Sequence, residues 1–149
     1  MRLRSGAQTL PTVPLRSYSS VCVSVWNYYK QSQFRSLTLQ QAEMAQQFVK
    51  AQIKGDKVVV FMKPTCSFCI MAKDVLSNYK FKPGHIQYID INSRSDMDSI
   101  QDYLLELTGQ RTVPRVFIGE ECVGGGSDVA ALHRSGKLEG MLQAVGAVQ

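Results

Sequence analysis

Hydrophobic positions follow a regular pattern from about residue 44 onward. Between residues 45 and 54 they recur at helical spacing, at Phe48, Val49, Ala51 and Ile53. Gly55 follows where a helix C-cap is expected. Residues 58–62 then form an unbroken apolar run rich in valine, which is typical of a strand covered on both faces. The pattern therefore predicts a helix followed by a buried strand.

A second helix is predicted directly after this strand, over residues 66–79, with Thr65 as its N-cap. Four apolar side chains are expected to face the core from it: Ile70, Met71, Val75 and Leu76. The Pro-Gly pair at residues 83–84 marks a turn, and the alternation of apolar and polar residues over 85–91 predicts a second strand.

A third helix is predicted to open at Ser95 or Asp96 and to end at Gly109, with Ile100, Leu104 and Leu107 on one face. The order of elements then changes. Residues 115–118 and 121–123 form a predicted hairpin with a two-residue connection, and two short helices follow over 129–134 and 138–145. The predicted order is βαβαββα with an extra helix at each end.

Residues 1–43 differ in composition from the rest of the chain. They contain five basic side chains and many serines, and Glu43 is their single acid. This composition is typical of a mitochondrial transit peptide, but Pro11 and Pro14 would break a long amphipathic helix, so a disordered extension is the alternative. The apolar segment 21–26 is expected to have no fold of its own. The two interpretations predict a mitochondrial and a cytoplasmic protein, respectively.

The charge and cysteine content of residues 44–149 narrow the functions that this part of the chain can have. These residues hold twelve basic and eleven acidic side chains, and this balance argues against nucleic-acid binding. No apolar run approaches the roughly 20 residues of a membrane-spanning helix, so no membrane partner is expected. Four cysteines, without a second pair at ligand spacing, predict neither a disulfide scaffold nor a zinc site.

The sequence Cys66-Ser67-Phe68-Cys69 lies between the first strand and the second helix, which indicates redox chemistry. A thiol at a helix N-terminus is stabilised as the reactive thiolate, and Lys63 adds a nearby cation. Cys66 is therefore expected to attack, while Cys69, one turn further, can resolve a mixed disulfide by forming a disulfide with Cys66. Two inert buried cysteines are the alternative.

Two further motifs are candidates for binding. In Thr112-Val113-Pro114 the proline is either a rigid strand entry or a cis residue that would turn the Val113 backbone outward to grip an extended peptide. In Gly124-Gly125-Gly126-Ser127-Asp128, glycines before a helix allow a carboxylate to approach backbone N–H groups, although a simple loop and cap explains the same residues.

These three motifs, in this order and at these separations, resemble the glutaredoxin family over residues 44–149. The resemblance implies an α/β thioredoxin-like fold, with a central four-stranded mixed sheet flanked by helices, and glutathione as co-substrate. It implies that Lys63 with Arg111 or Gln101 holds the glycyl carboxylate, and that Phe68 flanks the bound sulfur. Val113, between Thr112 and Pro114, would pair with the cysteinyl backbone, and Ser127 and Asp128 would take the γ-glutamyl end.

The expected function is glutathione-dependent reduction of protein–glutathione mixed disulfides and protein disulfides through Cys66, by a monomer. A second hypothesis is a dimer that holds a [2Fe–2S] cluster through Cys66 and glutathione, because Ser67 stands where many relatives carry proline. A thioredoxin-fold adaptor without turnover is the third. Gly126 occupies a position where relatives can carry another cysteine.

Overall fold

The computed structural model describes the backbone of residues 20–149 and the side chains of residues 24–149. The chain divides into two units, residues 1–37 and residues 38–149. The first helix, α1 (Ser20–Gln52), passes through the boundary between them. No helix of the described part is long and apolar enough to cross a membrane.

The helix α1 begins well before the predicted start at residue 45. Residues 20–52 contain no glycine or proline, so nothing in the backbone interrupts helical hydrogen bonding across this stretch. The apolar segment 21–26 lies within the helix, contrary to the expectation that it has no fold of its own. The helix ends at Gln52, before Gly55, which lies in a turn rather than at a C-cap. Pro11 and Pro14 lie outside the described residues.

The sheet has four strands in the order β2-β1-β3-β4, as expected for a thioredoxin-like fold. They are β1 (Val58–Met62), β2 (Ile86–Asp90), β3 (Arg115–Ile118) and β4 (Glu121–Gly124). The β1 strand pairs in parallel with β2 and antiparallel with β3, and β3 pairs antiparallel with β4. The sheet is therefore mixed, and the predicted hairpin forms its edge.

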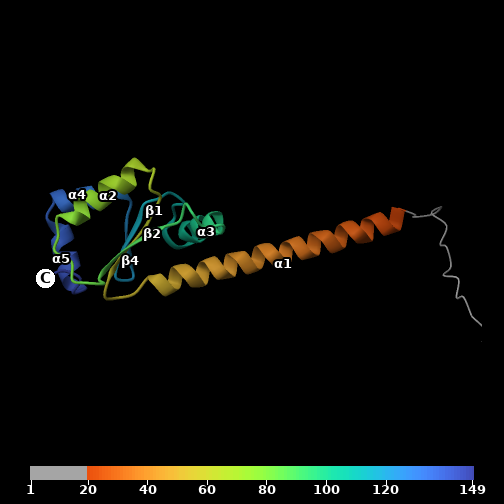
Figure 1. Ribbon diagram of the computed structural model, residues 1–149, viewed down its shortest axis with the longest axis horizontal. Helices are drawn as coiled ribbons and strands as arrows, with labels where there is room; N and C mark the ends of the chain where they lie inside the picture. Colours follow the sequence, from red (N-terminus) through yellow and green to blue (C-terminus); the bar gives the residue numbers. More distant parts are fainter. Residues whose placement is uncertain (1–19) are drawn as a thin grey trace, which may run out of the picture. The chain divides into compact units, whose positions relative to one another are not determined.

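Helices cover both faces of the sheet (Figure 1). On one face lie α2 (Ser67–Ser77), α4 (Gly126–Arg134) and α5 (Lys137–Ala144), packed on Val58 and Val60. On the other face, α3 (Met97–Thr108) and residues 45–53 of the chain pack on Val59 and Phe61. Successive β1 side chains thus enter two different cores, which explains why the strand has no polar position.

The core face of α2 differs from the prediction. Cys69, Ala72 and Leu76 are buried, whereas Ile70 and Met71 are 50% and 40% exposed. The N-cap is Cys66 rather than Thr65, and no side chain caps the helix. On α3, Ile100 and Leu104 are buried as predicted, but Leu107 is 47% exposed. In each helix, the buried face is narrower than the positions of the apolar residues predict.

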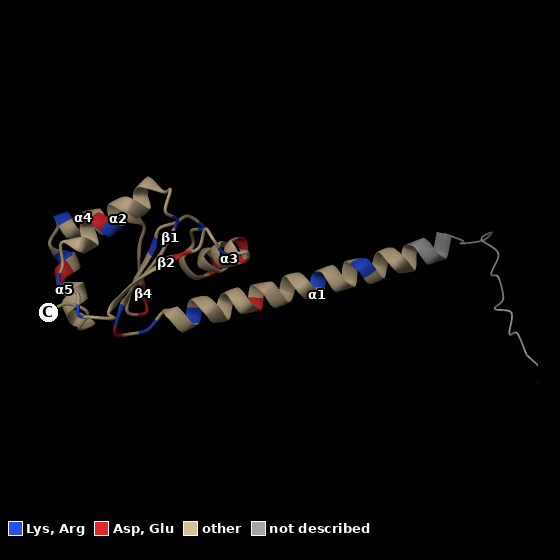
Figure 2. Ribbon diagram, viewed as in Figure 1, with Lys and Arg blue, Asp and Glu red and all other residues tan. Residues whose placement is uncertain are grey.

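Basic and acidic residues both occur on α4 and α5 and around α3 (Figure 2). The helix α1 carries Lys30, Arg35 and Lys50 against Glu43. The mixed charges over the sheet domain agree with its near-neutral composition.

Candidate active site

Cys66 lies where the loop after β1 meets the N-terminus of α2. Its backbone is extended, with φ −89° and ψ 120°, and its carbonyl oxygen accepts the Cys69 and Ile70 N–H groups, both at 3.1 Å. The side chain is half-buried, and Cys66 and Cys69 are both free thiols. The first N–H groups of α2 and their helix dipole are therefore directed at the Cys66 sulfur.

The surroundings of Cys66 lower the pKa of its thiol. Partial burial raises the pKa, and it is the one contribution in that direction. Hydrogen bonds from the Cys69 thiol and from the Cys69 and Phe68 N–H groups lower the pKa and outweigh the effect of burial. The Lys63 cation acts in the same direction as these hydrogen bonds. The thiolate form is therefore favoured at Cys66 relative to an ordinary cysteine.

Cys69 has the opposite properties. Its side chain is fully buried, and this burial raises the pKa of its thiol from the ordinary 9.0 to about 11, with the neighbouring Cys66 adding to the rise. The Lys63 N–H donates to the Cys69 sulfur at 3.5 Å and lowers the pKa in part. The pKa values of the two thiols, three residues apart, are thus shifted in opposite directions.

The Val113–Pro114 peptide bond is cis, which resolves the alternative that the sequence left open. In the protonated state, the Cys66 thiol donates to the Val113 carbonyl oxygen at 3.5 Å. Pro114 is buried, whereas Thr112 is exposed. The structure therefore places the Val113 backbone directly beside the reactive sulfur.

Lys63, Gln101 and Arg111 are linked in a chain of hydrogen bonds. Lys63 Nζ donates to Gln101 Oε1 at 3.1 Å, and Gln101 Nε2 donates to the Arg111 carbonyl oxygen at 3.0 Å. Gln101 is 8% exposed and both ends of its amide are used. A buried amide thus connects the cation near Cys66 to the loop that carries Val113.

The Arg111 side chain is engaged by two acidic residues of α3. Its Nε donates to Asp102 Oδ1 at 2.7 Å and its guanidinium reaches Asp98 Oδ1 at 3.2 Å. Neither aspartate was predicted from the sequence, because nothing in their local pattern indicates that this part of α3 faces Arg111. The two carboxylates compensate the charge of Arg111, although the guanidinium has five N–H donors and these two bonds use only Nε and Nη2.

The glycine-rich segment brings the N-terminus of α4 against that of α2. A Cβ on Gly126 would overlap the carbonyl oxygen of Phe68, and one on Gly125 would lie 3.5 Å from the Pro114 carbonyl oxygen. The Gly125 N–H donates to Asp128 Oδ2 at 2.8 Å, which is the half of a capping box that needs no side chain at the N-cap. Ser127 lies exposed in the first turn, and Phe68 is 52% exposed.

The three motifs therefore converge at one place in the fold. Cys66 is beside Val113, Phe68 is beside Gly126, and Pro114 is beside Gly125. The tertiary structure thus joins a thiolate, a strand entry and a helix N-terminus that the sequence separates widely.

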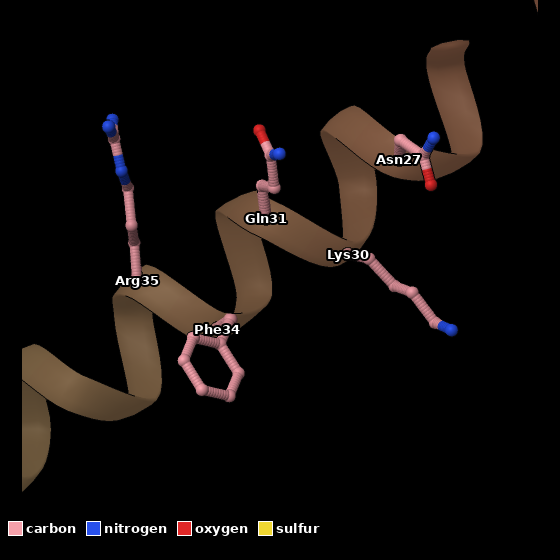
Figure 3. A pocket seen from close by; sticks show the side chains of 5 residues that line it. All are labelled: Asn27, Lys30, Gln31, Phe34 and Arg35. Atoms are coloured by element: carbon pink, nitrogen blue, oxygen red, sulfur yellow. The ribbon is translucent and has the colours of Figure 1, made fainter. Parts of the chain in front are cut away.

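A hollow on the N-terminal part of α1 is unrelated to this chemistry. Its lining residues are Asn27, Lys30, Gln31, Phe34 and Arg35 (Figure 3). All five come from one helix, and in Figure 3 Gln31 and Arg35 extend to one side while Lys30 and Phe34 extend to the other. They do not converge on a common point, so this hollow is not a candidate active site.

The chain resembles known proteins in sequence and in structure. A family model described as Glutaredoxin matches residues 58–123. Glutaredoxin-1 of Sus scrofa is 52% identical over 106 residues, which cover 71% of this chain and 100% of the relative. Glutaredoxin-1 of Homo sapiens is 50% identical with the same coverage of both chains.

Solved structures lead to the same family. A buckwheat glutaredoxin–glutathione complex superposes with a TM-score of 0.68 at 39% identity and covers 74% of this chain and 97% of its own. A mutated buckwheat glutaredoxin gives a TM-score of 0.69 at 38% identity, with 75% and 99% coverage. Because half of the sequence is shared along the whole length of the curated relatives, and the Cys-x-x-Cys turn lies in the same fold, the chain belongs to the glutaredoxin family.

Proposed function

We propose that this protein is a glutathione-dependent oxidoreductase that removes glutathione from protein cysteines through Cys66. One observation carries the proposal: the sulfur whose thiolate is favoured lies 3.5 Å from the Val113 carbonyl oxygen, at the entry to β3. Glutathione is a short peptide, and backbone pairing at such an edge is a common way to hold one. The reactive sulfur and the peptide edge therefore suit a substrate in which one sulfur of the disulfide belongs to a short peptide.

The reaction has two exchange steps. The Cys66 thiolate attacks the glutathione sulfur of a protein–glutathione disulfide, the protein thiolate leaves and takes a proton, and Cys66 carries glutathione. A second glutathione, as thiolate, attacks the glutathionyl sulfur, which releases glutathione disulfide and restores the Cys66 thiolate. Each step breaks one S–S bond and forms another, so the net reaction consumes one free glutathione and yields the protein thiol and glutathione disulfide.

Three regions would hold the glutathionyl group. Its glycyl carboxylate suits the Lys63 cation together with Gln101 or Arg111, and its cysteinyl backbone suits Val113, between Thr112 and Pro114. The γ-glutamyl end, with one ammonium and one carboxylate, suits Asp128 and the backbone around Ser127. Phe68, half-exposed beside Cys66, would flank the sulfur. These contacts remain proposals for this chain, supported by the convergence of the motifs.

Cys69 would act only where a protein disulfide is reduced. Its pKa of about 11 keeps it protonated near neutral pH, so it does not compete with Cys66 for the first attack. Once Cys66 is in a mixed disulfide with a protein, Cys69 is close enough in the helix to displace that protein and to form the Cys66–Cys69 disulfide.

Single-cysteine variants test the assignment with a glutathionylated peptide as substrate. Cys69→Ser should retain turnover with glutathione, whereas Cys66→Ser should lose it to the background rate. Reduction of a protein disulfide should decline in both variants. Turnover that survives in Cys66→Ser would exclude Cys66 as the nucleophile.

The [2Fe–2S] dimer remains a prediction of the Ser67 turn alone. A cluster needs four ligands, so one Cys66 from each of two chains would have to be joined by two glutathione thiolates. No contact of the described residues favours this arrangement over the enzymatic role. The protein substrates and the monomeric state are likewise predictions.

The cellular location also stays a prediction. A cytoplasmic location agrees with the resemblance of residues 44–149, and import into the mitochondrion would depend on the residues before them.

A further inference from the structure

Arg115 is a buried arginine at the first position of β3. It is 3% exposed, and its strand register places it opposite Phe61 of β1 in the middle of the sheet. Arg94 and Arg111 form ion pairs, whereas Arg115 has no carboxylate partner among the described residues. A buried guanidinium without a counter-ion is costly, so its hydrogen bonds must compensate.

All of the hydrogen bonds of Arg115 go to the segment just before the cis proline. Its Nε donates to the Thr112 carbonyl oxygen at 2.9 Å, and one terminal nitrogen donates to Thr112 Oγ1 at 2.9 Å. The same nitrogen also donates to Gln110 Oε1. The planar fork of a guanidinium can bind these acceptors together, which a lysine ammonium on a flexible stem cannot reproduce.

A second group holds the same segment from α3. Gln101 Nε2 donates to the Arg111 carbonyl oxygen at 3.0 Å, between the two residues that Arg115 binds. Residues 110–112 are thus attached to β3 through Arg115 and to α3 through Gln101. Val113 follows immediately, and its carbonyl oxygen lies against the Cys66 sulfur.

Arg115 does not act on the thiol itself. The cation that lowers the pKa of Cys66 is Lys63, and the other favourable contributions come from Cys69 and Phe68. An effect of Arg115 on turnover would therefore have to pass through the position of the loop rather than through the thiolate population.

We propose that Arg115 is a positioning residue for glutathione: its fork attaches residues 110–112 to the sheet and so sets the Val113 backbone at the distance from Cys66 that a glutathionyl peptide requires. This inference rests on the proposed function, because it assigns Val113 to the bound peptide. It also explains why a charged side chain occupies a core position of the strand that leads out of the site.

The test compares two reactions of the same cysteine. Turnover of a glutathionylated peptide needs the Val113 edge, whereas alkylation of Cys66 by iodoacetamide needs only the thiolate. Arg115→Met should lower kcat/KM for the peptide by about tenfold or more, since displacement of a site by about 1 Å can cost up to about a hundredfold. The rate and pH profile of alkylation should stay as in the wild type. Arg115→Lys keeps the charge but not the planar guanidinium. It should likewise lower kcat/KM for the peptide and leave the alkylation of Cys66 unchanged.

Arg94→Met is the matched control. Arg94 forms a partly buried, two-point ion pair with Asp96 at 2.8 Å, but it contacts no residue of the loop. Its loss can lower the melting temperature and should leave kcat/KM unchanged. Assays are run well below the melting temperature of each variant, measured in parallel.

The outcomes separate the two claims. If the wild type does not turn over the peptide, the proposed function fails. If the wild type is active but the Arg115 variants match its kcat/KM, or lose alkylation and turnover equally, the positioning role fails. Should Arg115→Met not fold, Arg115→Lys decides. Gln110→Leu, which removes one acceptor of the fork, should lower kcat/KM in the same direction and to a smaller extent, and an unchanged value would count against the role.

Discussion

The largest contribution that lowers the pKa of Cys66 is a hydrogen bond from the Cys69 thiol, ahead of the backbone N–H groups and of Lys63. Cys69→Ala removes this donor, Cys69→Ser keeps a hydroxyl in its place, and Lys63→Gln removes the cation. These three changes should therefore affect the pKa of Cys66 to different extents. Cys69→Ala should raise it most, and Cys69→Ser should raise it less.

The size of the effect follows from the strength of such bonds. A hydrogen bond to a charged group is worth about 1.5–3 kcal/mol when well shielded, and one pKa unit corresponds to about 1.4 kcal/mol. Because Cys66 is half-exposed, the lower end applies, and Cys69→Ala should raise its pKa by about one unit. Removing the Lys63 charge near solvent should raise it by a few tenths of a unit.

The rate changes less than the thiolate population. At pH values below the pKa of Cys66, a rise of one unit lowers the thiolate fraction by about tenfold, but the more basic thiolate is intrinsically about threefold more nucleophilic, so the alkylation rate there should fall by about threefold. The midpoint of the pH profile, rather than its plateau, reports the pKa. The activity of the wild type should accordingly be present above the pKa of Cys66 and be lost as the pH falls through it.

The assay is iodoacetamide alkylation across a pH series, with the modified cysteine identified by peptide mass spectrometry. The buried Cys69 should react much more slowly than Cys66 at neutral pH. The reasoning is wrong if Cys69→Ala leaves the midpoint of Cys66 unchanged, or if Lys63→Gln moves it further than Cys69→Ala does.

Three other predictions concern stability, affinity and the N-terminal residues. Cys69 keeps its proton to a higher pH in the folded state than in the unfolded chain, so unfolding releases protons and stability should fall as pH rises from 9.0 toward about 11; thermal melts should show a smaller decline in Cys69→Ala than in the wild type, because Tyr79 and Tyr88 also have raised pKa values. Asp102→Asn should leave Arg111 paired with Asp98 alone and lower the KM for glutathione by up to about fivefold, with a smaller change at high salt; a KM equal to that of the wild type would show that Arg111 does not contribute to binding. Deletion of residues 1–43 should leave the melting temperature and kcat/KM near those of the full chain, whereas deletion of residues 1–49 should destabilise the domain because it removes the buried Ala45 and Val49.

The elements whose prediction was confirmed are those in which a local pattern matches the final environment. The valine run of β1 is apolar because its two sides enter two cores, and Gly109 ends α3 with φ 75°, a conformation that glycine adopts readily. The turn at Gly84 is also formed with a positive φ, at 79°. In these places the sequence alone was sufficient.

The wrong predictions of the buried helix faces have a common cause. Ile70 and Met71 are apolar and stand in a helix, but the partners that α2 meets, β1 and α4, cover only the stripe through Cys69, Ala72 and Leu76. Local hydrophobicity does not record how wide a face the neighbouring elements cover. The early start of α1 was missed for a different reason, since serines and basic residues suggested a tail although residues 20–52 contain no glycine or proline that would break a helix.

For the candidate site, the sequence by itself determined the chemistry: which thiol stands at the helix N-terminus, which cation precedes it, and which peptide edge and glycine segment are present. The tertiary structure decided how these parts meet. It made the Val113–Pro114 bond cis, placed Val113 at the Cys66 sulfur, occupied Arg111 with Asp98 and Asp102, and directed the fork of Arg115 to the loop. The physical reason is that reactivity and turn propensity depend on neighbours in the chain, whereas hydrogen-bond partners and burial depend on contacts between residues that are distant in sequence.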